Sequence, residues 1–547
     1  MKILARATAR QGKDETAKAI YLRLGRESMD AEDFLLLAWI FSRGDQKSLA
    51  RSSLEVARQL EPENSELLET LFRFELDDRA LSQAAADADR LSRQPGWEVR
   101  GMVALAEVKH LLHEPGASVE LLRRALDLDP ELRGCRVSPR NARRLLATCL
   151  LETGSPSEAR AELEALLAAG ADAELSWLLS RALLMEKRTA QAAEVAQQAR
   201  SQGVDDPMRS EPAPFVGAAS CESCHPREYR ALGQSNHSRT LLRGKELEHL
   251  PWPVEPLLDG SNPGVSHEFA RTDRGIEFRT KVDQQAYAAI VEYAMGSTHQ
   301  GRSFVGREPG GRARELRISQ YPREPIWSLT MDHPDRATDP SDYVGRALDQ
   351  ETFRRCLNCH STNFQAIQHS QGKPEALDPG IGCERCHGPG GHHRAAVEAG
   401  FPELALVRPK RARADQVTGL CSQCHSPPTT MDLSDPRAIR FQGPTFSRSR
   451  CYTESGSFSC VSCHNPHRNA GRNPTEYEAI CLKCHPSSSN QENERVADLP
   501  GGRTWVPCPI RPDGDCLSCH MPRVRDVVPR SMFTDHYIRI RPKPSAR

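Results

Sequence analysis

The sequence predicts an all-α protein in two parts. Residues 1–202 are expected to form a helical solenoid, and residues 215–547 a region of mainly short helices and loops with a small β element. Small residues recur at a fixed interval in the first part, and fourteen of the 18 cysteines fall in closely spaced pairs in the second. The segment 203–214 contains three prolines and is predicted to be a linker. A length of 547 residues agrees with several structural units, because a domain commonly has roughly 100–200 residues.

The charge balance and the mean hydropathy argue against nucleic-acid binding and against a membrane-spanning helix. Lys plus Arg and Asp plus Glu each total 73, which gives no support for a nucleic-acid binder acting through bulk charge. Mean hydropathy is −0.58, and no apolar run approaches the roughly 18 residues that a membrane-spanning helix needs. We therefore expect neither a nucleic-acid partner nor a transmembrane segment.

The first part repeats every 34 residues. Ala50, Ala84 and Ser118 are 34 residues apart, as are Ala159 and Ala193. A helix-turn-helix unit of this length with small residues at fixed points resembles the tetratricopeptide repeat, in which small side chains let helices approach closely. We count five or six units, with Gly12, Gly44 and Gly154 at turns within repeats and a longer loop over residues 133–139.

Most apolar side chains of such a solenoid only bury one helix on the next. We expect this packing role for Trp39, Trp177, Cys135 and Cys149. The functional property is the shape, because stacked repeats form a concave surface that holds a peptide or a partner protein. The solenoid is therefore predicted to dock a protein partner.

The small β element is expected at about 262–320. Apolar and polar residues partly alternate over 265–282 on both sides of Asp273-Arg274-Gly275, which predicts a hairpin. A second pair of strands is predicted at 302–305 and 315–318. Beyond residue 350, Pro and Gly are frequent and the predicted helices are short.

Seven Cys-x-x-Cys-His motifs dominate the second part. They are Cys221/Cys224/His225, Cys356/Cys359/His360, Cys383/Cys386/His387, Cys421/Cys424/His425, Cys460/Cys463/His464, Cys481/Cys484/His485 and Cys516/Cys519/His520. In a helical turn, residues i, i+3 and i+4 share one face, so each motif directs two thiols and one imidazole at a single object.

This geometry predicts covalent haem c, with two thioether bonds and the motif His as the proximal iron ligand. A zinc site would need two Cys pairs for each ion and would not require a His after every pair. A disulfide framework has no need of the His, and a redox-active Cys-x-x-Cys normally occurs once. Seven haems c would also fill a core in a chain with only 5% aromatic residues.

The second axial ligand of each iron decides between electron transfer and chemistry. Ten further histidines follow residue 205, which is enough for seven irons: His237, His249, His267, His299, His333, His369, His392, His393, His467 and His536. We expect distal ligands at His237, His393, His467, His536, His333 and His369. His467 and His393 lie too close in sequence to their own motifs to reach round the same porphyrin, so each should bind a neighbouring iron.

The region from Val216 to the C-terminus resembles the cytochrome c-554 and hydroxylamine-oxidoreductase-like superfamily, in particular the members fused to tetratricopeptide repeats. The resemblance is carried by the segments at 216–226, 235–237, 295–303, 383–390, 460–467, 516–522 and 534–536. It implies distal ligands at His237, His393, His467 and His536. Relatives often place a His one position after His299, so ligation by His299 does not follow from the resemblance. No Cys-x-x-Cys-Lys variant occurs.

Three functions agree with these observations, because the superfamily contains both electron carriers and oxidoreductases of nitrogen compounds. The first, which we favour, is a relay of single electrons through mostly bis-His haems to a redox partner protein. The second is an oxidoreductase in which one open haem acts on a small nitrogen or sulfur compound, with Tyr287, Tyr293, Arg302 or His299 at the open face. The third is an assembly scaffold in which the solenoid carries the function. Whether the protein is an enzyme stays open at this point.

Two further expectations concern the cell compartment. Covalent haem attachment takes place outside the bacterial cytoplasm, so we expect a periplasmic or extracellular protein, and an oxidising compartment favours a disulfide between Cys451 and Cys508. The first residues lack the apolar stretch and cleavage site of a signal peptide and resemble the end of a repeat's first helix. We therefore expect a signal segment upstream of the given start, the alternative being a true start with another route of export.

Overall fold

The structure is a computed structural model. It describes residues 1–44, 46–77, 80–204, 208–209, 212–297, 299–322, 327–363, 378–401, 406–426, 434–485, 508, 510–511, 514–525 and 532–540. The chain divides into two compact units, one made of Met1–Val204 with Pro212–Pro214 and the other of Asp205–Glu211 with Phe215–Arg547.

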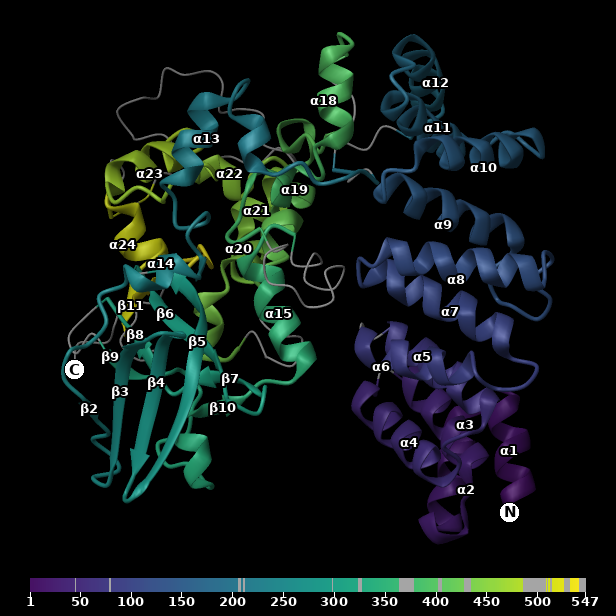
Figure 1. Cartoon of the computed structure of the whole chain (residues 1–547), viewed down its shortest axis with the longest axis horizontal. Helices are drawn as coiled ribbons and strands as arrows, with labels where there is room; N and C mark the ends of the chain where they lie inside the picture. The colour runs from purple at the N-terminus through teal and green to yellow at the C-terminus, as the bar shows by residue number, and fades with distance from the viewer. Residues whose placement is uncertain are drawn as a thin grey trace. The chain divides into compact units, whose positions relative to one another are not determined.

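The first unit is entirely helical in its described residues, and its helices stack one pair after the next (Figure 1). Its α-helices are α1 (Lys2–Arg10), α2 (Asp14–Leu24), α3 (Ala31–Arg43), α4 (Lys47–Leu60), α5 (Ser65–Asp77), α6 (Leu81–Leu91), α7 (Glu98–Leu111), α8 (Pro115–Leu128), α9 (Pro139–Glu152), α10 (Pro156–Ala168), α11 (Ala173–Met185) and α12 (Thr189–Ser201). Consecutive helices pack on each other along the whole series. The longer connection that the sequence predicts at 133–139 lies between α8 and α9.

Small residues sit where helices approach closely, as the 34-residue spacing predicts. Ala50, Ala84, Ser118 and Ala159 are all 0% exposed, and the hydroxyl of Ser118 donates a hydrogen bond to the Ala106 carbonyl on the preceding helix (3.0 Å). Ala193 is only half-buried. In the last repeat the close contact is therefore made by its neighbours on α12.

Local sequence explains where these helices begin and turn. Asp30 and Asp33 form a reciprocal capping box at the start of α3, which satisfies backbone N–H groups that have no partner within the helix. The three glycines predicted in turns lie between α1 and α2, α3 and α4, and α9 and α10. Gly12 and Gly154 have φ near +73° and +79°, a conformation that favours glycine.

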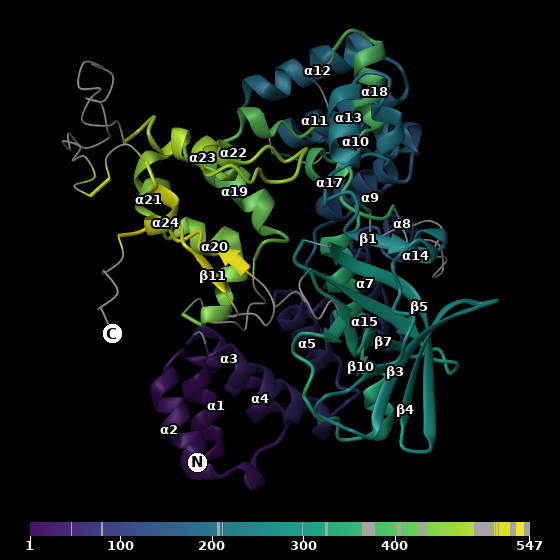
Figure 2. The same cartoon turned by 90° about the vertical axis from the view of Figure 1, so that its left-hand side faces the viewer.

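The second unit begins with short elements and then forms a large antiparallel sheet, whose long strands β3, β4 and β5 lie side by side in Figure 2. The strands are β1 (Leu241–Arg243), β2 (Leu257–Leu258), β3 (Val265–Thr272), β4 (Gly275–Val282), β5 (Gln285–Ser297), β6 (Gly301–Arg307), β7 (Ala313–Leu316), β8 (Ile318–Gln320), β9 (Trp327–Leu329) and β10 (Gly345–Ala347). The main path runs β10-β7-β6-β5-β4-β3-β2, and β1, β8 and β9 pair beside it.

The prediction of a small β element was wrong in extent. The hairpin of β3 and β4 is confirmed, with Val265 opposite Val282 and Thr272 opposite Gly275, and β6 pairs with β7 as expected. However, the described sheet has ten strands and runs from Leu241 to Ala347. The sequence concealed β5, whose alanine-rich stretch is typical of a helix, and the three-residue strands, which are too short to show alternation.

The sheet has a conventional apolar core. Trp252, Phe269, Phe304 and Trp327 pack ring against ring, with centroids 4.8–5.9 Å apart. The few aromatic residues of the chain are thus concentrated here. The sheet is therefore stabilised by an apolar core of its own. The segments that follow it need another source of stability.

Those segments consist of short helices. They are α15 (Gln350–His360), α17 (Cys383–His387), α18 (Gly391–Glu398), α19 (Ala414–Ser422), α20 (Gln442–Ser447), α21 (Arg450–Ser455), α22 (Cys460–Cys463), α23 (Pro474–Cys481) and α24 (Cys516–His520), and the two strands β11 (Arg523–Arg525) and β12 (Met532–Thr534) pair near the end. The 3₁₀ helix η2 (Ala218–Cys221), α13 (Pro226–Gly233) and α14 (Lys245–Glu248) precede or interrupt the sheet. Among the described residues, no helix has the length and apolar character needed to cross a membrane.

Candidate haem-binding sites

Short helices present the Cys-x-x-Cys-His motifs as the sequence predicts. Five of the motifs lie on or at the end of α15, α17, α19, α22 and α24, while the first follows η2 and the sixth follows α23. None of the fourteen motif cysteines is fully buried, so each sulfur stays accessible for a covalent bond. The second, third and seventh motifs lie wholly within a helix, which puts both thiols and the imidazole on one face.

The motifs differ in how far the polypeptide covers them. Residues of the first, sixth and seventh motifs lie at the surface, namely Cys224, His225, Cys484, His485 and Cys519, and so does His425 of the fourth motif. Among the described residues, the elements that carry the first, sixth and seventh motifs are short, namely η2 with α13, the end of α23, and the five-residue α24.

Haem attachment at these exposed residues stays a prediction. The thiols of Cys224 and Cys519 lie 3.8 Å and 3.7 Å from the hydroxyl of the serine that precedes each of them, so both remain close to solvent-exposed polar groups. His225 lies close enough to His387 for its charge to lower the pKa of that imidazole. The first motif therefore adjoins the third, and a haem attached there would have one edge in solvent.

Three motif histidines share one orientation, in which Nδ1 faces a polar oxygen. His387 Nδ1 lies 3.1 Å from the Val407 carbonyl, His520 Nδ1 lies 3.0 Å from the Arg539 carbonyl, and His425 Nδ1 lies 3.2 Å from the amide oxygen of Gln442. A carbonyl oxygen can only accept, so Nδ1 carries the hydrogen and Nε2 keeps its lone pair. This is the usual arrangement of a metal-binding histidine.

His360 of the second motif is held most closely. Its Nδ1 lies 2.7 Å from the Thr240 hydroxyl and 3.0 Å from the Thr240 carbonyl. Thr240 comes directly before β1, so the edge of the sheet sets the orientation of this imidazole. Nothing in the sequence pointed to Thr240, because a threonine far from the motif has no spacing that links it to His360.

Three imidazole pairs bring together one motif histidine and one histidine from outside the motifs. Ring centroids are 6.3 Å apart for His387 and His467, 6.3 Å for His425 and His237, and 6.2 Å for His464 and His536. His467 therefore lies opposite the third motif and not its own fifth motif. The expectation that His467 serves a neighbouring site has this geometric support.

These distances fit an iron between the rings. Two imidazoles that bind one metal from opposite sides, each nitrogen about 2 Å from the ion, have centroids about 6 Å apart. Interplanar angles of 3°, 69° and 36° are all compatible, because each ring can rotate about its own bond to the metal. Two of the three outer histidines have the same Nδ1 arrangement, with Nδ1 of His536 2.9 Å from the Thr534 carbonyl and Nδ1 of His237 3.4 Å from that of Pro466.

Desolvation favours the neutral form of four of these six imidazoles. It is the largest cause that lowers the pKa of His387, His425 and His464, and it lowers the pKa of His536 to about 4. A protonated imidazole has no lone pair for a metal. The surroundings of these four rings therefore favour the form that can bind a metal.

Cysteines of different motifs also meet. The thiols of Cys221 and Cys383 lie close enough to shift each other's pKa, and the same holds for Cys359 with Cys424 and for Cys421 with Cys460. These contacts join the first motif to the third, the second to the fourth, and the fourth to the fifth. Groups attached at these sulfurs would lie edge to edge.

Glu384, between the two cysteines of the third motif, connects distant segments. Its buried carboxylate accepts backbone hydrogen bonds from Val216 (2.9 Å), Gly217 (2.8 Å) and Gly390 (2.7 Å). The residue thereby fixes the entry to the first motif against the third. Sequence reasoning missed Glu384, and the only available signal was an acidic residue at an otherwise variable position of a motif.

The remaining candidate histidines lack a facing motif histidine among the ring pairs described above. His393 lies on α18 near His387, close enough for their charges to interact. His333 is buried with Nε2 3.4 Å from a carboxylate oxygen of Glu315, and His369 lies outside the described residues. Ligation by His393, His333 and His369 therefore stays a prediction. His299 is exposed, in a turn between β5 and β6.

The expected disulfide between Cys451 and Cys508 was wrong, because both thiols are free in the structure. Burial raises the pKa of Cys451, whose charged neighbours are the thiols of Cys463 and Cys484. Cys508 instead faces the backbone amides of Ile510 and Arg511, which lower its pKa. The two cysteines belong to different local environments.

Comparison with known proteins agrees with this geometry. A family model described as cytochrome c554 and c-prime matches residues 328–388, which contain the second and third motifs, and a tetratricopeptide repeat model matches residues 113–176. The multiheme cytochrome MtrA of Shewanella baltica (strain OS185) is 24% identical over 178 residues, which cover 30% of this chain and 45% of that protein. The chain therefore combines a part similar to tetratricopeptide repeats with a part similar to multihaem cytochromes, and this similarity supports bound haem c. The matched residues cover less than half the length of this curated relative.

Solved structures with similar helices are weaker matches. The chain is similar to pilF of Pseudomonas aeruginosa (19% identity, 37% of this chain and 90% of that chain, TM-score 0.30) and to YrrB, a tetratricopeptide repeat protein (18% identity, 32% and 88%, TM-score 0.28). The repeat assignment of the first unit therefore rests on its family model, its 34-residue spacing and its packed helix pairs.

Proposed function

We propose that the chain relays single electrons through seven covalently attached haems c, most of them with two histidine ligands. The observation that carries the proposal is the set of three trans imidazole pairs, His237/His425, His467/His387 and His536/His464, at 6.2–6.3 Å. An iron held by two imidazoles has no free position for a substrate. Haem c itself supplies a reversible one-electron change of its iron.

The chain's own residues orient and space the proposed centres. Oxygen acceptors at Nδ1 hold four of the paired imidazoles and increase their electron donation, namely His387, His425, His536 and His237. This arrangement favours bis-His centres of low reduction potential.

The contacts between motifs support a path through the relay. Thiol contacts connect motifs one and three, two and four, and four and five. The charge of Cys424 influences Cys386, which brings motifs three and four together, and Cys481 is influenced by both Cys516 and Cys463. We infer the order one, three, four, five, six, seven, with the second motif as a branch on the fourth.

Both ends of this path are surface-exposed motifs, and the sixth motif, next to one end, is exposed as well. Cys224 and His225 belong to the first motif and Cys519 to the seventh, and all three side chains are exposed. Electron exchange with another protein needs a centre whose edge reaches solvent. The exposure of the terminal motifs therefore supports entry and exit of electrons at the two ends of the relay.

The repeat unit would dock the redox partner, because stacked repeats provide an extended binding surface. Attachment of haem c outside the bacterial cytoplasm supports a periplasmic or extracellular location. We propose both the docking function of the repeat unit and the location outside the cytoplasm.

Coordination of the irons tests the proposal. The oxidised protein, produced in a host competent for cytochrome maturation, should contain seven irons per chain and show a low-spin electron paramagnetic resonance spectrum for most of them. A large high-spin fraction that shifts on addition of nitrite or hydroxylamine would overturn the carrier function in favour of an oxidoreductase. An iron content far below seven per chain would overturn the haem assignment.

A further inference from the structure

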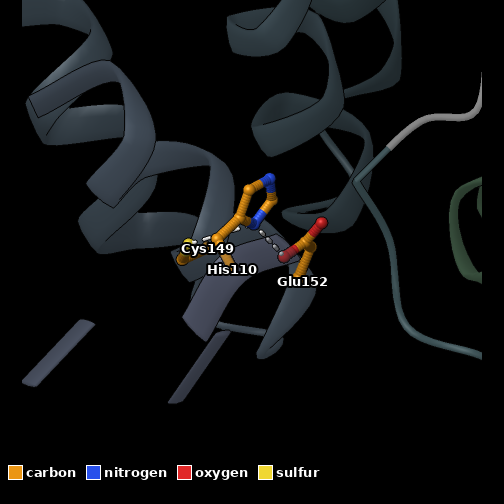
Figure 3. Close-up of side chains that lie close together, drawn as sticks. All are labelled: His110, Cys149 and Glu152. Atoms are coloured by element: carbon orange, nitrogen blue, oxygen red, sulfur yellow. Dashed lines mark hydrogen bonds and ion pairs between the residues drawn. The ribbon is translucent and has the colours of Figure 1, made fainter. Parts of the chain in front are cut away.

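The first unit contains a cluster of metal-binding side chains that its packing function does not explain. His110 comes from the last turn of α7, and Cys149 and Glu152 from the last turn of α9. Figure 3 shows the His110 ring between the thiol and the carboxylate. Cys149 and Glu152 are three residues apart and therefore share one face of α9.

The three side chains converge on a single point. His110 Nδ1 lies 3.6 Å from Cys149 Sγ and 3.3 Å from a carboxylate oxygen of Glu152, and all three ligand atoms lie within 4.8 Å of one another (Figure 3). A tetrahedral zinc ion with Zn–S of about 2.3 Å and Zn–N and Zn–O of about 2.0–2.1 Å has S···N edges of about 3.5 Å and N···O edges of about 3.4 Å. The two measured edges match these lengths.

The surroundings also favour a cation. Both helices direct their C-terminal ends toward the cluster, and the partial negative charge of a helix C-terminus attracts positive charge.

The exposure of the three side chains indicates where the fourth coordination position of the ion would lie. Cys149 is 0% exposed, whereas the side chains of His110 and Glu152 are 27% and 25% exposed. A buried thiol cannot attack a substrate, but an ion lying above it would reach solvent between the imidazole and the carboxylate. Mixed N, O and S donors suit zinc better than calcium or magnesium, which prefer oxygen alone.

We propose that His110, Cys149 and Glu152 bind one zinc ion, with the fourth coordination position open to water or to a side chain of a docked protein. The ion would join α7 to α9 and so connect two successive repeats of the solenoid. This site is independent of the haem motifs, since the three residues all lie in the first unit.

Metal analysis of the untagged, haem-loaded full chain tests the site. After removal of loosely bound metal and dialysis against zinc, we expect about one zinc per chain, with iron per chain as the internal count of haem. C149A and E152Q should each lower zinc affinity at least tenfold and leave the iron content unchanged. The matched controls C135A and E164Q, which alter a thiol and a carboxylate of the same unit outside the cluster, should retain the zinc.

X-ray absorption at the zinc edge provides a second measurement that does not depend on a variant folding. It should show one sulfur at about 2.3 Å and nitrogen or oxygen neighbours at about 2.0–2.1 Å. A wild-type chain that takes up no zinc, zinc retained at full affinity in C149A and E152Q, or a zinc shell without sulfur would each overturn the proposal. The first result would leave the three residues as a hydrogen-bonded contact between helices.

Discussion

The imidazole rings of His387 and His467 are parallel, with an interplanar angle of 3° and centroids 6.3 Å apart. His467 follows its own motif histidine, His464, by only three residues, yet it faces the third motif. Close neighbours in sequence thus face different motifs.

Removal of His467 should open the third centre. In H467A the iron bound by His387 would lose its proposed second ligand and become high-spin, whereas H467M would keep a sixth ligand and raise the reduction potential, because methionine ligation raises the potential. Electron paramagnetic resonance and a redox titration of the oxidised protein measure both effects. H299A, at an exposed turn, is the control, and an unchanged spin state in H467A would contradict the pairing.

Thr240 should tune the centre of the second motif. T240V removes the hydroxyl that lies 2.7 Å from His360 Nδ1 but leaves the backbone carbonyl as an acceptor. Loss of one hydrogen bond worth about 0.5–1.5 kcal/mol in the oxidised state should raise the potential of this centre by about 20–60 mV. Spectroelectrochemistry measures the shift. T272V, which alters a threonine of the same unit at the β3–β4 turn, should leave every potential unchanged.

Glu384 should be a stability determinant of the haem unit. E384Q removes the charge that accepts hydrogen bonds from three backbone N–H groups, and we expect the free energy of unfolding to fall by about 2 kcal/mol. Thermal unfolding of the haem-loaded protein measures the loss as a lower midpoint. E398Q changes an exposed glutamate on α18 and should have little effect, so equal midpoints for the two variants would show that Glu384 does not tie the segments together.

Glu75 should make the repeat unit less stable at high pH. Glu75 on α5 is 9% exposed, and burial, followed by the nearby charge of Asp87, raises its pKa to about 8 from 4.5. Between these two pH values the folded chain binds more protons than the unfolded chain. The free energy of unfolding therefore falls as pH rises, by an amount on the order of 2–4 kcal/mol.

Unfolding of the repeat unit, followed by helix content from pH 5 to pH 9, measures this slope. E75Q cannot titrate and should flatten the slope, whereas E55Q, at an exposed position of the neighbouring α4, should not. A wild-type repeat unit whose stability rises from pH 5 to pH 8 would contradict the assignment.

Sequence patterns predicted those features that have a fixed spacing. The 34-residue interval located buried contacts such as Ala50 and Ala84, and the alternation over 265–282 located the β3–β4 hairpin. The motif spacing predicted that two thiols and a histidine share one face of a helical turn, as in α15, α17 and α24. It also predicted that His467 could not serve its own motif, because that argument needs only chain length and the width of a porphyrin.

The same spacing could not show how far each motif is buried. Cys224, His225 and Cys519 are exposed, although their motifs have the same pattern as the more covered ones. Cover depends on which segments fold over a motif, and the neighbours of the first and seventh motifs are too short to provide it. An identical local pattern therefore occurs in two different environments.

Other features depend on contacts between residues far apart in the sequence. His237 meets His425, Thr240 meets His360, and Glu384 meets Val216 only after the chain has folded. His110, Cys149 and Glu152 were overlooked for the same reason, since Cys149 alone is an ordinary buried cysteine. The full extent of the sheet was missed because β5 is rich in alanine and its outer partners have three residues each.

The interleaved histidine pairs have a consequence for biosynthesis. During synthesis the chain presents His237 long before His425, and His464 before His536, so these pairs form only when the late segments are present. A product that terminates shortly before β12 would lack His536 and leave His464 without its facing imidazole. Truncated and finished molecules would therefore differ in the state of this unit.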